Sequence, residues 1–500
     1  MLQSVIVYIL FLVLIQRHTF FNQFAIHKYA MPIFFSIKIV AGFVLYYIYN
    51  HFYENRGSGD VNKYFDDALV IYKAIGNNYM DYFKIVFNIN CNAPQMFHYF
   101  KEIDHWEVYG NTNFVNDART VIRFNLLLLP ISKGFYHFHS VVLNFISFIG
   151  LVFIYTTFCK INIDNKKRWA AICFLLPSLL FWCSGVLKEG LLIFFIGLFV
   201  HVLYILSEGI EERKYINFLW LIISLIGVFI TKFYVAFALL PLLFFYAFRN
   251  KKNISHTYKV LAFYLLILLV LFVDSVSTKV ILNPLAQKQK EFVNVAKGGY
   301  YFEVKSLTAI DTLYVEYINE KYLKKLSETN YEILKNCPVY FYDNLEILSA
   351  FKNKTKIENA YLLKVIVPAN SYIYLPAMQS RLSSLLEVLP IAIYNTLFLP
   401  TFFSIKNLMY LMPAFENLLF IILLFFAFFN GKKITKKQEY YNSLFLVFAI
   451  NLIVLIGLIT PVLGALIRYK VPVLPFLFFV LISKIDFTTS DNKNLKTNSE

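Results

Sequence analysis

Charged residues are scarce in this chain, and its cysteines form no metal-binding pattern. Asp, Glu, Lys and Arg make up only 16% of the 500 residues, and the five cysteines lack the spacing of a metal site. No Gly-rich loop opens a strand-to-helix turn, so the chain shows no sign of a soluble nucleotide-sugar domain. No internal repeat is visible, which leaves an inverted-repeat transporter without support.

Apolar residues are what the chain has in excess. They form 58% of the sequence, and the mean hydropathy is +0.58, whereas soluble domains are about 45–50% apolar. Several runs approach the ~20 residues that cross about 30 Å of hydrocarbon as a helix. The N-terminus has no basic region and no small-residue cleavage site, so we expect a retained first helix. We therefore predict an all-α polytopic membrane protein with about eleven transmembrane helices, at residues 2–16, 31–49, 139–158, 169–186, 190–206, 216–231, 233–248, 259–275, 407–429, 441–460 and 470–484.

The distribution of charge predicts the topology. The net charge is +16, and basic clusters at 160–168, 249–259 and 432–437 are typical of cytoplasmic loops. Counting spans between them places the N-terminus outside and the C-terminus in the cytoplasm. Residues 385–403 are broken by prolines, so we expect a re-entrant or surface-lying helix there, and residues 121–131 are expected to lie in the interface.

The predicted organisation has two large extracytoplasmic loops. The parts are 1–49 (two transmembrane helices), 50–138 (an outer loop with candidate catalytic carboxylates), 139–275 (the transmembrane core), 276–406 (a second outer loop), 407–485 (the C-terminal transmembrane helices) and 486–500 (a disordered cytoplasmic tail).

The first outer loop holds a group of carboxylates. Asp60 is followed by Asp66 and Asp67, at i+6 and i+7, and on a helix these lie on the same side as Asp60. Such a cluster can bind a divalent metal, act as a general base or hold a cation. The alternative is a solvated acidic loop.

This segment, GDVNKYFDDA at 59–68, resembles the first outer loop of polytopic glycosyltransferases of the GT-C fold. The resemblance implies a lipid-linked sugar donor, commonly polyprenyl phosphate, and a catalytic acid early in that loop. By position Asp60 becomes the candidate general base, with Asp66 or Asp67 as runner-up and Tyr64 lining the cavity. Three further segments are similar to membrane proteins of bacterial polysaccharide assembly: VIRFNLLLLPISKGFYHFHSVVLNFISFIGL, RWAAICFLLPSLLFWCSGVLKEG and LIRYKVPVLPFL.

Two charged positions lie between strongly apolar runs. Lys188 and Glu189 form an adjacent pair, which is costly in a membrane unless it is paired or faces a water-filled cavity. Lys188 is a candidate ligand for the donor phosphate and Glu189 a cavity-lining residue; the alternative is a helix-hairpin turn. Lys232 and Tyr234 are candidates for the same cavity, or for a tight turn.

Arginines near the predicted outer face complete the candidate site. The charge count places Arg468 and Lys470 outside, against the usual excess of basic residues on the cytoplasmic side. This placement favours an anionic ligand such as a phosphate, with which Arg can make bidentate contact. The alternative is snorkelling at the interface. Arg119 and Arg123 are spaced i, i+4, so both would face one anion or the lipid head groups.

The resemblance implies sugar transfer from a polyprenyl-phosphate donor to a glycan or lipid-linked acceptor, without nucleic acid, at the outer face of a bacterial inner membrane. A divalent cation is left open as a cofactor. One alternative is an O-antigen or exopolysaccharide polymerase or ligase that acts on undecaprenyl-diphosphate oligosaccharides. Another is a non-enzymatic flippase or transporter of lipid-linked glycans.

Overall fold

The chain is mostly helical. The computed structural model describes residues 2–51, 60–91, 93–100, 103, 105–106, 117–209, 213–247, 256–272, 277–297, 299–305, 310–315, 323–325, 330–333, 338–340, 354–356, 362–366, 369–405 and 408–487. The longer helices are α1 (Leu2–Arg17), α3 (Ala30–His51), α4 (Asp60–Ile75), α5 (Tyr79–Phe87), α6 (Asp117–Ser132), α7 (Tyr136–Ile161), α8 (Lys166–Phe174), α10 (Lys188–Ser207), α11 (Lys214–Thr231), α12 (Phe233–Ala247), α13 (His256–Phe272), α15 (Asn283–Lys297), α16 (Leu382–Phe398), α17 (Leu411–Phe429), α18 (Lys436–Ile459), α19 (Leu463–Lys470) and α20 (Leu474–Lys484). Two short α-helices are α2 (Thr19–Asn22) and α9 (Pro177–Trp182).

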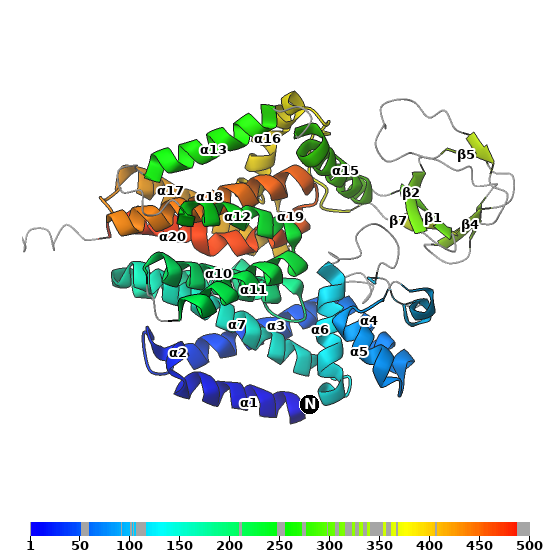
Figure 1. Ribbon diagram of the computed structural model, residues 1–500, viewed down its shortest axis with the longest axis horizontal. Coiled ribbons are helices and arrows are strands. Elements are labelled where there is room, and N and C mark those ends of the chain that lie inside the picture. The colour runs from blue at the N-terminus through cyan, green and yellow to red at the C-terminus, as the bar shows by residue number, and fades with distance from the viewer. Residues whose placement is uncertain are drawn as a thin grey trace, which may run out of the picture.

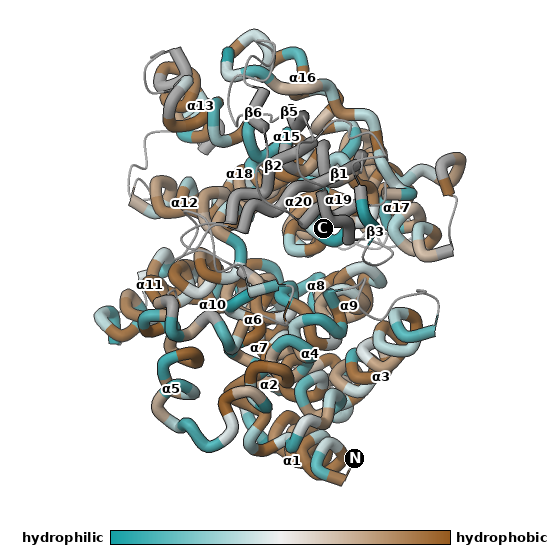
Figure 2. The backbone as a smooth tube through the Cα atoms, turned by 90° about the vertical axis from the view of Figure 1, so that its right-hand side faces the viewer, coloured by the Kyte–Doolittle hydropathy of each residue, from teal (hydrophilic) through white to brown (hydrophobic). Residues whose placement is uncertain are grey.

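The chain is a multi-pass membrane protein. Seven helical segments of the described chain are long and apolar enough to cross a bilayer: Ala30–His51, Tyr136–Ile161, Lys188–Ser207, Lys214–Thr231, Leu411–Phe429, Lys436–Ile459 and Leu463–Lys484. Four shorter apolar helices are Leu2–Arg17, Phe233–Ala247, Tyr258–Leu269 and Leu382–Phe398. Most of these helices run alongside one another in one bundle (Figure 1), and brown, apolar stretches recur along them (Figure 2).

The prediction of one span at 169–186 is wrong. The chain forms two short helices there, α8 and α9, separated at Leu175 and Leu176. Pro177 causes the break, because it has no amide hydrogen to continue the helix and disfavours helical geometry in the residue before it. Leu176 accordingly has φ −60° and ψ 120°.

Two glycines let the central helices α7 and α10 approach closely. A methyl group on Gly197 would lie less than 3.0 Å from the Gly150 carbonyl, and one on Gly150 would collide with the Phe194 backbone. Small residues at such contacts allow backbones to pack in membranes, where no hydrophobic effect drives helices together.

Three helices from the first predicted outer loop gather at one end of the bundle (Figure 1). The segment 121–131, expected at the interface, lies within α6, whose Val121 and Ile122 are fully buried. Next to it, α5 carries exposed apolar side chains at Tyr79, Phe83 and Phe87.

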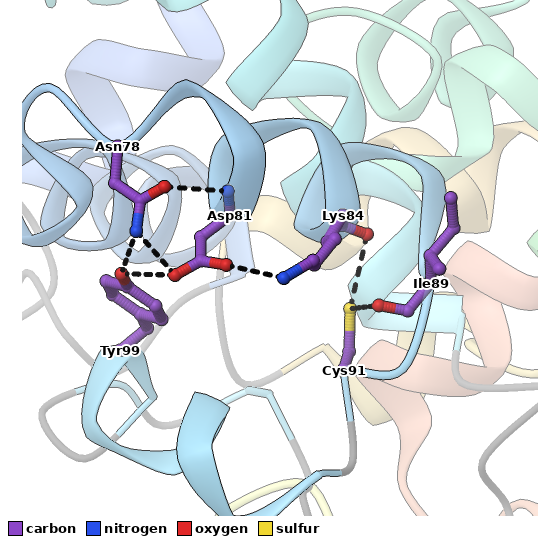
Figure 3. A network of polar contacts seen from close by, with 6 residues as sticks. All are labelled: Asn78, Asp81, Lys84, Ile89, Cys91 and Tyr99. Carbon is purple, nitrogen blue, oxygen red and sulfur yellow. Dashed lines mark hydrogen bonds and ion pairs between the residues drawn. The ribbon is translucent and has the colours of Figure 1, made fainter.

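Polar contacts fix the start of α5 to the 3-10 helix at Pro94–Tyr99 (Figure 3). Asn78 caps α5 by accepting from the Asp81 amide at 3.1 Å, and the Asp81 carboxylate accepts from Tyr99 at 2.9 Å and from Lys84 at 3.0 Å. The Cys91 thiol is buried and donates to the Lys84 carbonyl at 3.5 Å.

The second predicted outer loop contains strands, so the all-α prediction does not hold there. A five-stranded antiparallel sheet has the order β2-β1-β7-β4-β3, and β5 pairs with β6. In Figure 1 these strands lie beyond α15. The expected helix at 385–403 is present as α16, which packs along α18. The strands are β1 (Gly299–Lys305), β2 (Ile310–Val315), β3 (Leu323–Lys325), β4 (Asn330–Ile333), β5 (Pro338–Tyr340), β6 (Lys354–Lys356) and β7 (Leu362–Ile366).

Candidate functional site

Arg468 joins two carboxylates that come from distant parts of the chain. Its Nη1 donates to Oδ2 of Asp60 at 2.6 Å, and its Nη2 donates to Oε2 of Glu189 at 2.8 Å. A second ion-pair contact links its Nε to Glu189 Oε1 at 2.7 Å. The guanidinium therefore contacts Glu189 through Nη2 and Nε, and Asp60 through Nη1.

Lys232 and Lys188 extend this cluster. The Lys232 ammonium donates to Oε1 of Glu189 at 2.8 Å and lies 4.0 Å from the ring centroid of Tyr469. The Lys188 ammonium lies 5.6 Å from the ring centroid of Tyr64. Aromatic faces attract such cations when they are withdrawn from water.

Exposure divides the cluster into an inner and an outer part. The side chains of Glu189 and Lys232 are 0% and 2% exposed, and that of Arg468 is 12% exposed, whereas that of Asp60 is 33% exposed. Glu189 thus anchors the cations from within. Asp60 is the carboxylate that an incoming molecule can reach.

Helix ends position these side chains. Asp60 and Glu189 lie in the first turns of α4 and α10, where the backbone amides favour negative charge. Arg468 lies in the last turn of α19, and Lys232 directly follows α11. Asp60, Glu189 and Arg468 therefore have the sign that their helix ends favour, whereas Lys188, the first residue of α10, does not.

The electrostatic environment keeps Asp60 ionised. Burial alone would raise the pKa of its carboxyl, but the charges of Arg468 and Lys188 outweigh burial and hold this pKa well below its usual range. Asp60 is therefore a carboxylate at neutral pH, able to accept a proton or a hydrogen bond.

The two runner-up carboxylates have different surroundings. Asp67 is buried, accepts from the His105 amide at 3.1 Å and lies 3.3 Å from Nδ1 of His105. The His105 ring meets that of Tyr64 edge-on at 5.7 Å, so this pair lies beside the cluster. Asp66 is half-buried on the same helix.

The structure assigns Arg119 and Arg123 to separate contacts. Arg119 is buried with its guanidinium 5.0 Å from the ring centroid of Trp106, and Arg123 donates to the Val86 carbonyl at 2.7 Å. Arg123 therefore holds the last turn of α5 against α6. The expectation that both face one anion is not met, because each meets a different loop or helix.

Lys470 points away from Arg468. Its ammonium donates to the carbonyls of Thr396 and Leu399 at 3.3 and 3.1 Å, and to Oδ1 of Asn417 at 2.8 Å. Residues 468–470 are helical, and two residues turn a helix by about 200°. The expectation that Lys470 shares the phosphate site with Arg468 is therefore wrong.

Three residues near the site were not predicted. Tyr469 covers Lys232, while Lys38 and Glu416 bind the two ends of α9. Lys38 is a single charge within a 22-residue apolar helix, and Glu416 is a single acid in α17. A lone ionisable residue within a predicted span is the signal that could have found both. Tyr234 lies near the cluster, with its ring centroid 6.0 Å from the Lys232 ammonium.

Comparisons with protein-family models, with curated proteins and with solved structures give no match to this chain. Within the part of the chain that the structure describes, no group of three or more His, Cys, Asp or Glu side chains is placed to hold a metal ion.

Proposed function

We propose that the chain is a membrane glycosyltransferase that takes a sugar from a polyprenyl-phosphate donor at the cluster around Arg468. The observation that carries the proposal is the ion pair between Arg468 and Asp60, because it brings a cation suited to phosphate next to an accessible carboxylate. The resemblance of the Asp60 segment to GT-C enzymes supports the same assignment.

The charge of the cluster suits an anionic group. Three cations, Arg468, Lys188 and Lys232, lie on or beside the carboxylates of Asp60 and Glu189. A donor phosphodiester carries one negative charge. Guanidinium and ammonium groups stabilise such a charge most strongly in surroundings of low dielectric.

The proposed reaction follows from these placements. The acceptor hydroxyl attacks the anomeric carbon, its proton passes to the Asp60 carboxylate, and the bond from that carbon to the phosphate oxygen breaks with inversion. The hydroxyl becomes strongly acidic as its new bond forms, so a carboxylate of low pKa is able to take the proton. Polyprenyl phosphate leaves as an anion, which Arg468 and Lys188 stabilise.

The acceptor is a glycan or a lipid-linked saccharide, and the reaction takes place at the outer face of a bacterial inner membrane. The lipid tail of the donor lies between the membrane helices. In this proposal the sugar binds at the end of the bundle where α4 and α6 lie (Figure 1).

A transporter of lipid-linked glycans is the second candidate. Buried charges inside candidate spans favour it, and Lys38 and Glu416 are 1% and 4% exposed. Both charges, however, bind backbone groups at the ends of α9. They therefore have a local role that requires no transport path.

Replacement of Asp60 tests the proposal in cells. We expect Asp60→Asn to abolish maturation of the surface glycan while the protein still inserts into the membrane. Asp164→Asn is the matched control, because Asp164 is exposed and lies beyond the far end of α7. Normal glycan in the Asp60→Asn strain would refute the mechanism, and loss only with Asp67→Asn would move the base to Asp67.

A further inference from the structure

α9 is a six-residue helix held inside the bundle between two breaks. It starts at Pro177, after the gap that follows α8, and ends at Trp182, before the turn that leads into α10. A helix this short leaves most of its backbone amides and carbonyls without partners within the helix. In the apolar part of a membrane protein, other protein groups must bind them.

Glu416 binds the start of α9. Its Oε1 accepts the backbone N–H of Ser178, the second residue of the helix, at 2.6 Å. Glu416 comes from α17, which packs against α9. The carboxylate thus satisfies an amide of the first turn.

Lys38 binds the end of α9. Its ammonium donates to the Cys183 carbonyl at 2.6 Å and to the Ser184 hydroxyl at 3.2 Å, and Ser184 in turn donates to the Leu180 carbonyl at 2.5 Å. Lys38 comes from α3, which also packs against α9. The ammonium therefore satisfies carbonyl and hydroxyl groups where α9 ends.

The turn after α9 leads directly to the candidate site. Gly185 has φ +83°, a left-handed conformation that glycine adopts without strain, and a side chain there would press on Leu45. Three residues later α10 begins with Lys188 and Glu189, and Glu189 makes the ion pair with Arg468. The placement of α9 thus sets where these two charges lie.

We infer that Lys38 and Glu416 are positioning residues that hold α9 from its two ends, and so fix Lys188 and Glu189 against Arg468. This inference rests on the proposed function, because that function is what requires Lys188 and Glu189 to be held in place. It also explains why two charges are kept within otherwise apolar helices.

Binding of dodecyl phosphate to the full-length protein in lipid nanodiscs tests the inference. We expect Lys38→Met to weaken this binding by about tenfold or more, because a displacement of the order of 1 Å at a positioned group costs up to about a hundredfold. Glu416→Leu is expected to weaken it as well. Glu416→Gln keeps an acceptor for the Ser178 amide, so it is expected to retain most of the affinity.

A control variant separates positioning from loss of stability. Asn442→Ala removes the buried 2.8 Å hydrogen bond from Asn442 to Ser483. Asn442 lies in the first turns of α18, on the order of 25 Å along that helix from its end at Ile459. It is expected to lower the unfolding temperature without weakening the binding of dodecyl phosphate. If Lys38→Met does not fold, Ser184→Ala removes one of the two Lys38 contacts, and a smaller loss of about threefold is expected by the same reasoning.

The outcomes distinguish the two proposals. Absence of binding by the wild type, or equal binding by Arg468→Gln, would overturn the proposed phosphate site. Binding that Arg468→Gln loses but that Lys38→Met or Ser184→Ala leaves unchanged would overturn the positioning role alone. An equal loss in Asn442→Ala would also overturn it, because the effect would then follow stability and not position.

Discussion

Arg468 and Asp60 are 408 residues apart in the chain, and their side chains meet at 2.6 Å. The contact joins the start of α4 to the end of α19. The proposed site depends on this contact, which links the first predicted outer loop to the C-terminal helices.

The ionisation of Asp60 predicts how its contribution to stability changes with pH. Its pKa in the folded protein lies well below the usual value, and in the unfolded chain it is about 3.9. The stabilising contribution is therefore complete above about pH 4 to 5 and is lost as the pH falls toward the folded-state pKa. We expect the difference in unfolding temperature between wild type and Asp60→Asn to be constant from pH 8 to 5 and to shrink below pH 4. A difference that grew on acidification would contradict the assignment of Asp60 as an ionised partner of Arg468.

Burial predicts that Glu189 matters more for stability than Asp60. Glu189→Ala leaves the buried Arg468 and Lys232 without their shared carboxylate, and removal of one partner from a buried pair costs about 3–5 kcal/mol. Asp60 is one-third exposed, so Asp60→Asn is expected to cost about 1 kcal/mol or less. Unfolding by denaturant in nanodiscs measures both costs. Equal losses would show that the two carboxylates share one environment, contrary to the structure.

The contact between α7 and α10 predicts a strong effect of a small substitution. Gly197→Ala places a methyl group against the Gly150 carbonyl, and overpacking of this kind costs about 1–3 kcal/mol. Gly464→Ala is the matched control, because its nearest neighbours lie 3.9 Å or more from the added carbon. Thermal unfolding should therefore show a clear loss for the first variant and little change for the second.

The exposed face of α5 predicts a contact with lipid. Tyr79 is 80% exposed, while Phe83 and Phe87 are just over half exposed, and amphipathic helices with such a face lie in the membrane interface. The chain's other four cysteines are buried, so the label is introduced at Phe83→Cys in a Cys337→Ser background. This label should collide more often with oxygen than with a water-soluble nickel complex. The same label at Lys432→Cys, in an exposed loop, should show the reverse. Similar accessibility of the labels at positions 83 and 432 would show that α5 does not lie in the membrane interface.

The sequence predicted a multi-pass helical membrane protein because long apolar runs have no other stable environment, whereas seven of the described helical segments, not eleven, are long and apolar enough to cross a bilayer. It also pointed to Asp60 and Arg468, and their expected proximity is confirmed, because charges kept beside apolar runs gather where they can pair. Lys470 was assigned wrongly because the charge count gives only the side of the membrane, whereas the helix α19 turns by about 200° between Arg468 and Lys470 and so points them to opposite sides.

Other features depend on contacts that pattern alone does not reveal. The strands at 299–366 have mixed polar and apolar residues without a clear period, so their pairing depends on partners distant in sequence. Pro177 is a sequence signal for the break before α9, but the contacts of Lys38 and Glu416 with the two ends of that helix are not. Both residues come from helices far away in the chain.

Sugar transfer by the purified protein in proteoliposomes tests the central claim most directly. The donors are a panel of polyprenyl-phosphate hexoses labelled in the sugar, offered with lipid-linked saccharide acceptors. We expect the wild type to form labelled product and free polyprenyl phosphate in equal amounts, and Asp60→Asn to reduce the rate by about 10²- to 10⁴-fold, as removal of a general base does. The Asp164→Asn control should match the wild type. Transfer by Asp60→Asn at the wild-type rate, or no transfer by the wild type from any donor of the panel, would contradict the account.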